Sequence, residues 1–237
     1  MQRFMKLLKL WNGNNVEQSG SPLGAGMVAL EIDQMIARGM GRQMTVGAFS
    51  TGIVGGGAGT VFDLDQPEFV VGVPAGYCIR PLLISAQVQV ALVAADNEEN
   101  EILFAVDSLG GISGPLSAET CTIEVASNMR TDMPKGSACV CASAFTADMV
   151  TTPMYSAAAD PVLDIELARV VETFDIFSTG VSANLKRLDL VYQPNFPPFL
   201  VGPCTILGYW GGTVATIGGF AQLAWIEGRM QDFFVRV

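Results

Sequence analysis

The chain has 237 residues, half of them hydrophobic and only 15% charged, with a formal net charge of −10. The length suits one large β domain or two small ones, and the acidic balance argues against nucleic-acid binding by the body of the protein. The lack of any histidine disfavours Ser-His-Asp hydrolases, Cys-His hydrolases and most zinc enzymes. Because an average soluble domain is roughly 25% charged, we expect either that much surface is buried against other subunits or that the surface is unusually poor in charged groups. No apolar run approaches the ~20 residues that a membrane-spanning helix needs.

The first eleven residues, MQRFMKLLKLW, form a basic amphipathic segment. At helical spacing Arg3, Lys6 and Lys9 share one side, and Trp11 belongs to the apolar remainder. Lysines interrupt the apolar residues and no small-residue cleavage site follows, which argues against a secretory signal. The segment is typical of an arm that lies on a lipid surface or contacts nucleic acid or a neighbouring subunit. The alternative is a terminal helix that packs on its own domain.

Three parts of the chain differ in composition. Residues 1–26 combine the arm with a polar, flexible linker, and residues 27–43 are predicted to form a short helix or connector. Residues 44–237 are predicted to form one domain. Four apolar residues support the helix because they fall roughly on one face: Met27, Leu30, Met35 and Ile36.

From Met44 onward, short apolar or alternating runs are separated by Gly, Pro, Asn and Asp, which is the pattern of a β-sandwich or barrel. The clearest strand is Ser85–Val93, in which small or polar residues alternate with Ala86, Val88 and other apolar residues. Helices do not alternate with strands, which argues against a parallel sheet. Strands are predicted near 44–52, 60–64, 67–73, 77–94, 101–108, 119–127, 137–146, 162–176, 185–192, 204–210 and 219–227.

The last two of these strands are predicted to form a hairpin that closes the sandwich. We expect Trp210 and Trp225, on neighbouring strands, to cover a large part of one core. The loop between the strands, residues 211–219, is uncharged, whereas a solvent-facing loop of that length usually carries charge. This predicts a contact between subunits, with four candidate interface residues: Thr213, Val214, Thr216 and Ile217.

Three further loops carry candidate sites. Residues 52–59, GIVGGGAG, lack the GK[ST] ending of a phosphate loop and are interpreted as a mobile turn. Residues 96–101 are interpreted as a solvated acidic hairpin tip, with calcium binding as the alternative. Residues 128–136 are predicted to make a salt-linked contact within the chain or to a neighbour, through Arg130, Asp132 and Lys135. The candidate calcium ligands are Asp96, Glu98, Glu99 and Glu101.

The five cysteines do not have the spacing of a disulfide scaffold. Cys139 and Cys141 form a CxC pattern, which on a strand directs both thiols to one face. We expect small buried apolar residues in a reducing compartment, with a metal or redox site as the alternative. The cysteines are Cys78, Cys121, Cys139, Cys141 and Cys204.

Four segments within residues 44–227 carry a resemblance to known proteins: Val73–Leu82, Asp96–Val106, Asn128–Asp132 and Leu207–Thr213. They are similar to segments of bacteriophage virion proteins. Together with the basic arm, the linker and the many short strands, they make the chain resemble the jelly-roll structural proteins of bacteriophages and other viruses. The resemblance implies an all-β fold, an antiparallel β-sandwich of jelly-roll type with an N-terminal arm, and a capsid or capsid-decorating role as a trimer or pentamer. It transfers no binding residue.

We therefore expect a virion structural protein rather than an enzyme: a capsid, vertex or decoration subunit that is assembled in the host cytoplasm. Expected partners are further copies of the chain, with a trimer favoured and a pentamer as the alternative, and other virion proteins. The arm is expected to contact neighbours, the shell interior, an internal membrane or the genome, although three cations are few for genome neutralisation. No cofactor or small-molecule substrate is expected. The alternative is a trimeric jelly-roll binding module, lectin-like or C1q/TNF-like.

Overall fold

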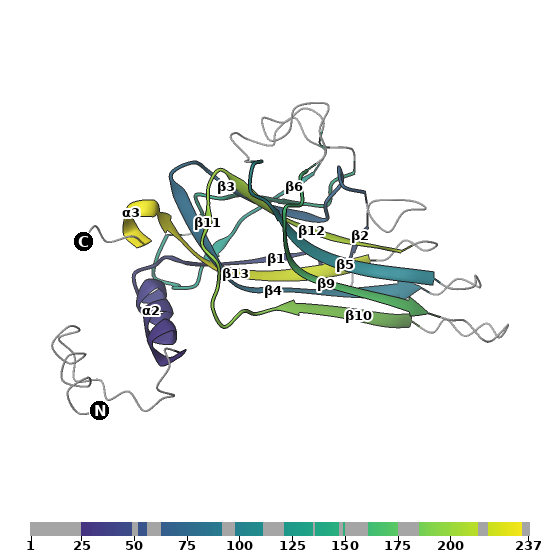
Figure 1. Cartoon of the computed structure of the whole chain (residues 1–237), viewed down its shortest axis with the longest axis horizontal. Helices are drawn as coiled ribbons and strands as arrows, with labels where there is room; N and C mark the ends of the chain where they lie inside the picture. The colour runs from purple at the N-terminus through teal and green to yellow at the C-terminus, as the bar shows by residue number, and fades with distance from the viewer. Residues whose placement is uncertain are drawn as a thin grey trace. The chain divides into compact units, whose positions relative to one another are not determined.

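The computed structural model of the chain describes residues 25–48, 52–55, 63–91, 98–110, 121–134, 136–146, 149, 161–174, 185–212 and 218–233. Residues 35–237 form one compact unit, and residues 1–34 belong to a separate one. Strands hold 58% of the described residues and lie in two antiparallel sheets (Figure 1). The predicted all-β antiparallel sandwich is therefore confirmed.

Helix α2 (Ala25–Ala37) occupies the region where a short helix is predicted. It ends because Gly39 has a left-handed φ of 78°, which glycine adopts without steric cost. The amide of Gly39 donates to the carbonyl of Ile36 at 2.8 Å, and the amide of Met40 donates to the carbonyl of Met35 at 3.1 Å. These two bonds satisfy the last helical carbonyls before the chain enters the first strand. A single turn, α3 (Met230–Phe233), follows the last strand.

Sheet I contains four long strands in the order β10-β4-β13-β1, with the short strand β7 beside β1 and two short strands paired to its members. The long strands are β1 (Gly41–Val46), β4 (Tyr77–Ala91), β10 (Leu185–Tyr192) and β13 (Gly218–Arg229). The short ones are β2 (Ile53–Val54), β7 (Ser127–Asn128) and β11 (Leu200–Val201). In Figure 1 this sheet forms the lower layer.

Sheet II forms the other layer, with the order β6-β8-β3-β12-β5-β9. Its strands are β3 (Phe69–Val73), β5 (Glu98–Asp107), β6 (Thr122–Glu124), β8 (Val140–Ser143), β9 (Ile165–Phe174) and β12 (Cys204–Gly212). Every residue of β3 and of β12 is buried. Such complete burial means that both faces of this sheet are covered.

The predicted closing hairpin is wrong, because β12 and β13 lie in different sheets. Strand β12 pairs with β3 and β5, whereas β13 pairs with β4 and β1. The chain therefore crosses from one layer to the other between Gly212 and Gly218. The same holds for β4 and β5, so the acidic segment between them is no hairpin tip either. Sequence proximity suggested both pairings, but burial of the apolar faces between two layers favours the crossing.

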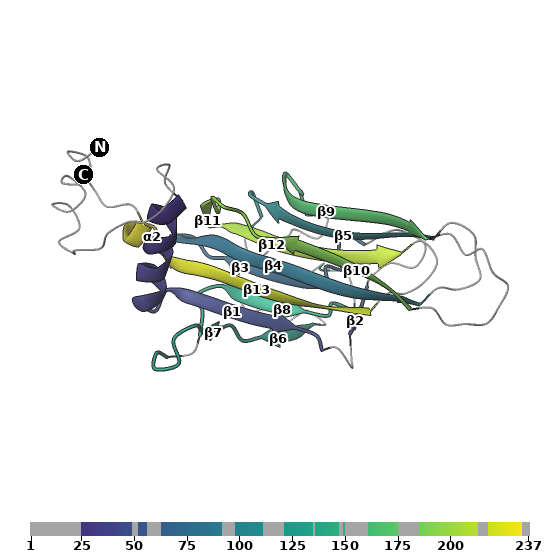
Figure 2. The same cartoon turned by 90° about the horizontal axis from the view of Figure 1, so that it is seen from below.

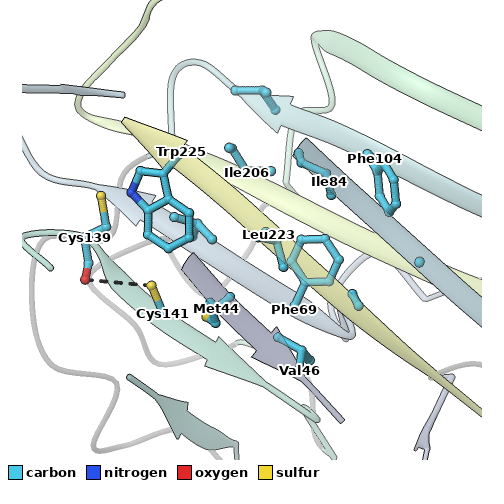
Figure 3. Close-up of a cluster of buried hydrophobic side chains, with 14 of the residues drawn as sticks. Met44, Val46, Phe69, Ile84, Phe104, Cys139, Cys141, Ile206, Leu223 and Trp225 are labelled. Atoms are coloured by element: carbon cyan, nitrogen blue, oxygen red, sulfur yellow. Dashed lines mark hydrogen bonds between the residues drawn. The ribbon is translucent and has the colours of Figure 1, made fainter. Parts of the chain in front are cut away.

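The core lies between the sheets, and both tryptophans contribute to it, as the sequence indicates. Trp210 comes from sheet II and Trp225 from sheet I, so they cover the core from opposite sides. Gly208 makes room for this packing, since a Cβ there would lie 2.0 Å from the ring of Phe69. Figure 3 shows inward-facing side chains of both sheets, among them Met44, Val46, Leu223, Trp225, Phe69, Phe104 and Ile206.

An insertion, residues 108–164, connects β5 with its neighbour β9 and extends both sheets at one edge. It adds β7 to sheet I, and β8 and β6 to sheet II. It also contributes Phe145 and Met149 to a second apolar cluster on the outer face of sheet II. Eight buried residues form this outer cluster: Val70, Leu103, Ala105, Ala142, Phe145, Met149, Leu207 and Tyr209.

Several local predictions need correction or refinement. Ile53 and Val54 form strand β2 against β13, so the glycine-rich segment 52–59 is not a simple turn; residues 56–59 lie outside the described residues. A Cβ at Gly55 would lie 2.2 Å from the carbonyl oxygen of Trp210, which explains a glycine there. The first strand begins at Gly41 and ends at Val46, earlier at both ends than predicted. Of the strand predicted at 60–64, only 63 and 64 are described, and they are not in a strand.

The polar loop at 128–136 makes the salt-linked contact that the sequence predicts, and it lies within the chain. Arg130 pairs with Asp132, with its Nε 2.9 Å from the carboxylate. The Arg130 guanidinium also donates to the carbonyl of Ala37. This arginine therefore links the loop to the end of α2. Lys135 lies outside the described residues.

Candidate functional site

The predicted interface residues, four in the arm and four in the loop after β12, all lie outside the described residues. For the loop, the ends of β12 and β13 show where it begins and ends. In the arm these residues are Arg3, Lys6, Lys9 and Trp11; in the loop they are Thr213, Val214, Thr216 and Ile217. Gly212 lies opposite Asn100 near the start of β5, and Gly218 lies opposite Gln89 near the end of β4. The strand ends that flank residues 92–97 and 213–217 therefore lie at the same end of the sandwich (Figures 1 and 2).

The predicted calcium ligands divide between two settings. Asp96 lies outside the described residues, whereas Glu98, Glu99 and Glu101 belong to strand β5. Glu101 is buried and pairs with Arg169 on β9. Burial raises the pKa of the Glu101 carboxyl, and the nearby Arg169 guanidinium opposes this shift only in part. The expected solvated turn is therefore wrong at this position, because the carboxylate serves as a buried partner between two strands.

The described residues contain no group of three or more Cys, Asp or Glu side chains placed to hold a metal ion. Asp107 and Asp164 instead bind backbone amides where the insertion leaves and rejoins sheet II. Asp107 accepts from the amides of Leu109, Gly110 and Val162 at 2.9, 2.6 and 3.0 Å. Asp164 accepts from the amide of Ser108 at 2.8 Å and from its hydroxyl. These carboxylates hold the two ends of the insertion together.

A buried ion pair lies within sheet I at the end where β1 begins, and its carboxylate also bonds to the segment that leads into sheet II. Arg42 Nε lies 3.0 Å from a carboxylate oxygen of Glu227, and both side chains are largely buried. The Glu227 carboxylate also accepts from the amide of Ala138 at 3.1 Å, from Trp225 Nε1 at 3.2 Å and from the Ser137 hydroxyl. Residues 137 and 138 lead into β8 of sheet II. The sequence placed Glu227 on the same strand face as Trp225, but it gave no sign of the arginine partner.

The cysteines are free thiols, and four of them are buried. Cys139 and Cys141 both belong to the inner core, which agrees with the common face predicted from their spacing. Burial raises the pKa of Cys141 to about 12 and that of Cys204 to about 12, while that of Cys78 rises to about 11. A raised pKa keeps these sulfurs protonated and disfavours nucleophilic chemistry. Figure 3 shows the Cys139 and Cys141 side chains at the edge of the core.

The outer face of sheet I is a regular surface built from four strands. Its outward side chains mix polar, small and apolar residues, and no described strand lies over it in Figures 1 and 2. Four of these residues are glutamines, and two of them, Gln43 and Gln222, are exposed. Sequence reasoning missed this surface, although the alternation in Ser85–Val93 already placed Gln87 and Gln89 on one face.

No helix within the described ranges combines the length and apolar character that crossing a membrane requires. Neither a protein-family model nor a curated protein matches this sequence.

Proposed function

We propose that this chain is a virion structural protein, a capsid, vertex or decoration subunit, and that its sandwich is a jelly roll. The observation that carries the proposal is the order of the eight long strands. In chain order they are β1, β3, β4, β5, β9, β10, β12 and β13.

The strands pair first with last along this series. β1 pairs with β13, β3 with β12, β4 with β10, and β5 with β9. Such pairing is what results when one long antiparallel hairpin is wrapped into two layers. Numbered from one to eight, the strands lie as 1-8-3-6 in sheet I and as 2-7-4-5 in sheet II. This arrangement supports the finer assignment of a jelly roll, an eight-stranded fold of two Greek keys.

The jelly roll occurs in viral capsid proteins, in lectins and in cupins, and fold alone does not decide among them. Composition favours the first. The chain has no histidine for an imidazole metal site, and with 15% charged residues it is poor in the charge that keeps a free domain in solution. An assembly subunit buries part of its surface and needs less charge.

The N-terminal arm completes the proposed subunit. Residues 35–237 have their own compact core, separate from residues 1–34. Deletion of residues 1–20 should therefore leave the β domain folded while impairing assembly. Thermal unfolding and particle yield measured together check this expectation. If the deletion unfolds the domain, the segment belongs to the core and is not an arm.

The direct test is electron microscopy of the purified chain, with native mass spectrometry of the same sample. Shells, or copies bound to particles, together with a trimer or pentamer in the mass spectrum, are the expected results. A stable, monodisperse monomer at micromolar concentration contradicts the proposal.

The second candidate is a trimeric binding module of lectin type. Lectins share the proposed strand order, and the amide-rich outer face of sheet I presents donors and acceptors for neutral ligands. Binding to a panel of neutral glycans, without particles in the microscope, would favour this candidate over the virion role.

A further inference from the structure

The outer face of sheet I carries almost no charge. Four rows of residues cross the sheet, and the register places their members side by side. The rows are Thr45, Gln222, Ser85 and Val191; Gln43, Ala224 and Leu83; Phe220, Gln87 and Asp189; and Gly218, Gln89 and Arg187. The inward neighbours of these residues, such as Val88 and Leu223, belong to the core, so the rows face outward.

The two charges in these rows neutralise each other. Arg187 Nε lies 2.8 Å from both carboxylate oxygens of Asp189, and both residues lie on the edge strand β10. The other residues of the four rows carry amides, hydroxyls and small or apolar side chains. Arg80, further along β4 on the same side, is buried and lies over the ring of Phe199. The neutrality of the rows stands out in a chain whose formal net charge is −10, because the acidic residues must lie on other surfaces.

We propose that this face binds the same face of a second copy of the chain. The inference rests on the proposed function, since it names one contact of the self-assembling subunit. Two copies related by a twofold axis present identical surfaces to each other, so a face with a net charge would meet a face of the same sign. A neutral face avoids this repulsion. Glutamine suits it further, because each amide both donates and accepts and can bond to its counterpart.

The size of the face indicates how strong the contact is. Four strands about 4.8 Å apart, over seven residues with a rise of about 3.3 Å, cover a flat area on the order of 400 Å² per copy. Stable complexes typically bury about 800 Å² per partner. A single contact of this kind is therefore about half the usual size, and association gains strength where each subunit makes several contacts at once.

Opposite charges on the same face provide the test. One variant carries Gln87→Glu and Gln222→Glu, and a second carries Gln87→Lys and Gln222→Lys. The control carries Thr131→Glu and Gln231→Glu, at exposed positions outside the four rows. Sedimentation velocity of the full chain, from about 10 µM to about 500 µM, measures association. Thermal unfolding of each protein checks that it is folded.

Wild type and control should associate alike, whereas the Glu variant and the Lys variant should each associate at least tenfold more weakly. An equimolar mixture of the two variants should recover association, since Glu then faces Lys in any twofold arrangement. Unchanged association of the Glu and Lys variants overturns the inference, as does loss without recovery in the mixture. A wild type that does not associate at these concentrations also overturns it. If all four proteins form particles equally well, this contact is rejected, but the proposed virion role is not contradicted.

Discussion

The outer faces of the two sheets differ sharply, although both belong to one sandwich. In sheet II the outward residues Leu103, Leu207 and Tyr209 are at most 1% exposed. In sheet I the outward residues Gln43 and Gln222 are exposed. Strands of sheet I alternate between apolar and polar residues, whereas β12 is apolar or small on both sides. A strand without polar alternation therefore signals a layer covered on both faces, even when its partners are antiparallel.

The cover on sheet II comes from two separate segments. Met149 in the insertion donates its amide to the carbonyl of Asp65 at 3.0 Å, and the Tyr209 hydroxyl donates to the carbonyl of Leu64 at 3.0 Å. These bonds bring residues 63–66 and the insertion together over the sheet. The outer cluster of sheet II thus stabilises the positions of residues 63–66 and of the insertion.

The buried ion pair of Arg42 and Glu227 in sheet I should give the largest effect. Arg42→Met leaves the Glu227 carboxylate buried without its cation, which should cost about 3–5 kcal/mol. Urea unfolding measures the loss. The double variant Arg42→Met with Glu227→Met should lose less than the two single changes added together, because their energies are coupled. Additive losses would show that the pair does not act as a unit.

The contrast between the outer faces predicts the next largest effect. Leu207→Ala removes a buried side chain from the outer cluster of sheet II and should destabilise the domain by about 2–5 kcal/mol. Val191→Ala, on the outer face of sheet I, should change stability by less than about 0.5 kcal/mol. Equal losses in chemical unfolding would mean that sheet I is also covered at Val191.

The inner core, shared by both sheets, predicts a smaller effect. Changing Cys139 and Cys141 to Ala should each cost at most about 1–2 kcal/mol through lost packing. Thermal unfolding and metal analysis of the double variant check this. Loss of a stoichiometric bound metal in that variant would reassign the two thiols from packing to ligation.

The pH dependence of two carboxyls should give the smallest effects, with opposite signs. Burial raises the pKa of the Glu101 carboxyl above 4.5. The stability that this carboxyl contributes to the fold is therefore present below that pH and is lost as the pH rises through the folded-state pKa. Bonds from Ser108 lower the pKa of Asp164 below 3.8, so its contribution is lost as the pH falls through the folded pKa.

Unfolding midpoints between about pH 3 and pH 7 separate the two groups. Glu101→Gln should reduce the fall of the unfolding midpoint toward higher pH. Asp164→Asn should reduce the fall of the midpoint toward lower pH. If Glu101→Gln instead reduces the loss of stability toward acid pH, the fold lowers the pKa of Glu101, and the effect of Arg169 on that pKa outweighs the effect of burial.

Local patterns predicted most strands, because alternation is written into neighbouring residues such as Ser85 to Gln89. They did not predict pairing. Trp210 and Trp225 looked like members of one hairpin, yet their strands lie in opposite layers, and only long-range packing decides this. Ile53 and Val54 form a strand inside a glycine-rich run, where a partner strand outweighs low local propensity.

The candidate sites show the same division. Glu101 looked like part of a solvated turn because a lone carboxylate usually faces water. Its partner Arg169 lies on a strand whose position no local pattern gives. The alternation from Ser85 to Gln89 placed two glutamines on one face of a strand, but the shared neutral surface becomes apparent only when the register puts Gln87 and Gln222 in neighbouring rows.

First-with-last pairing also governs how the chain can fold during synthesis. Strand β13 lies between β1 and β4, so those two strands never meet directly. Until residues 218–229 have been made, β1 has only the two-residue strand β7 beside it among the described strands. Domains dominated by such distant contacts fold slowly, and their apolar strands stay exposed meanwhile. Strand β1 therefore cannot join β4 and β10 in sheet I until residues 218–229 have been made.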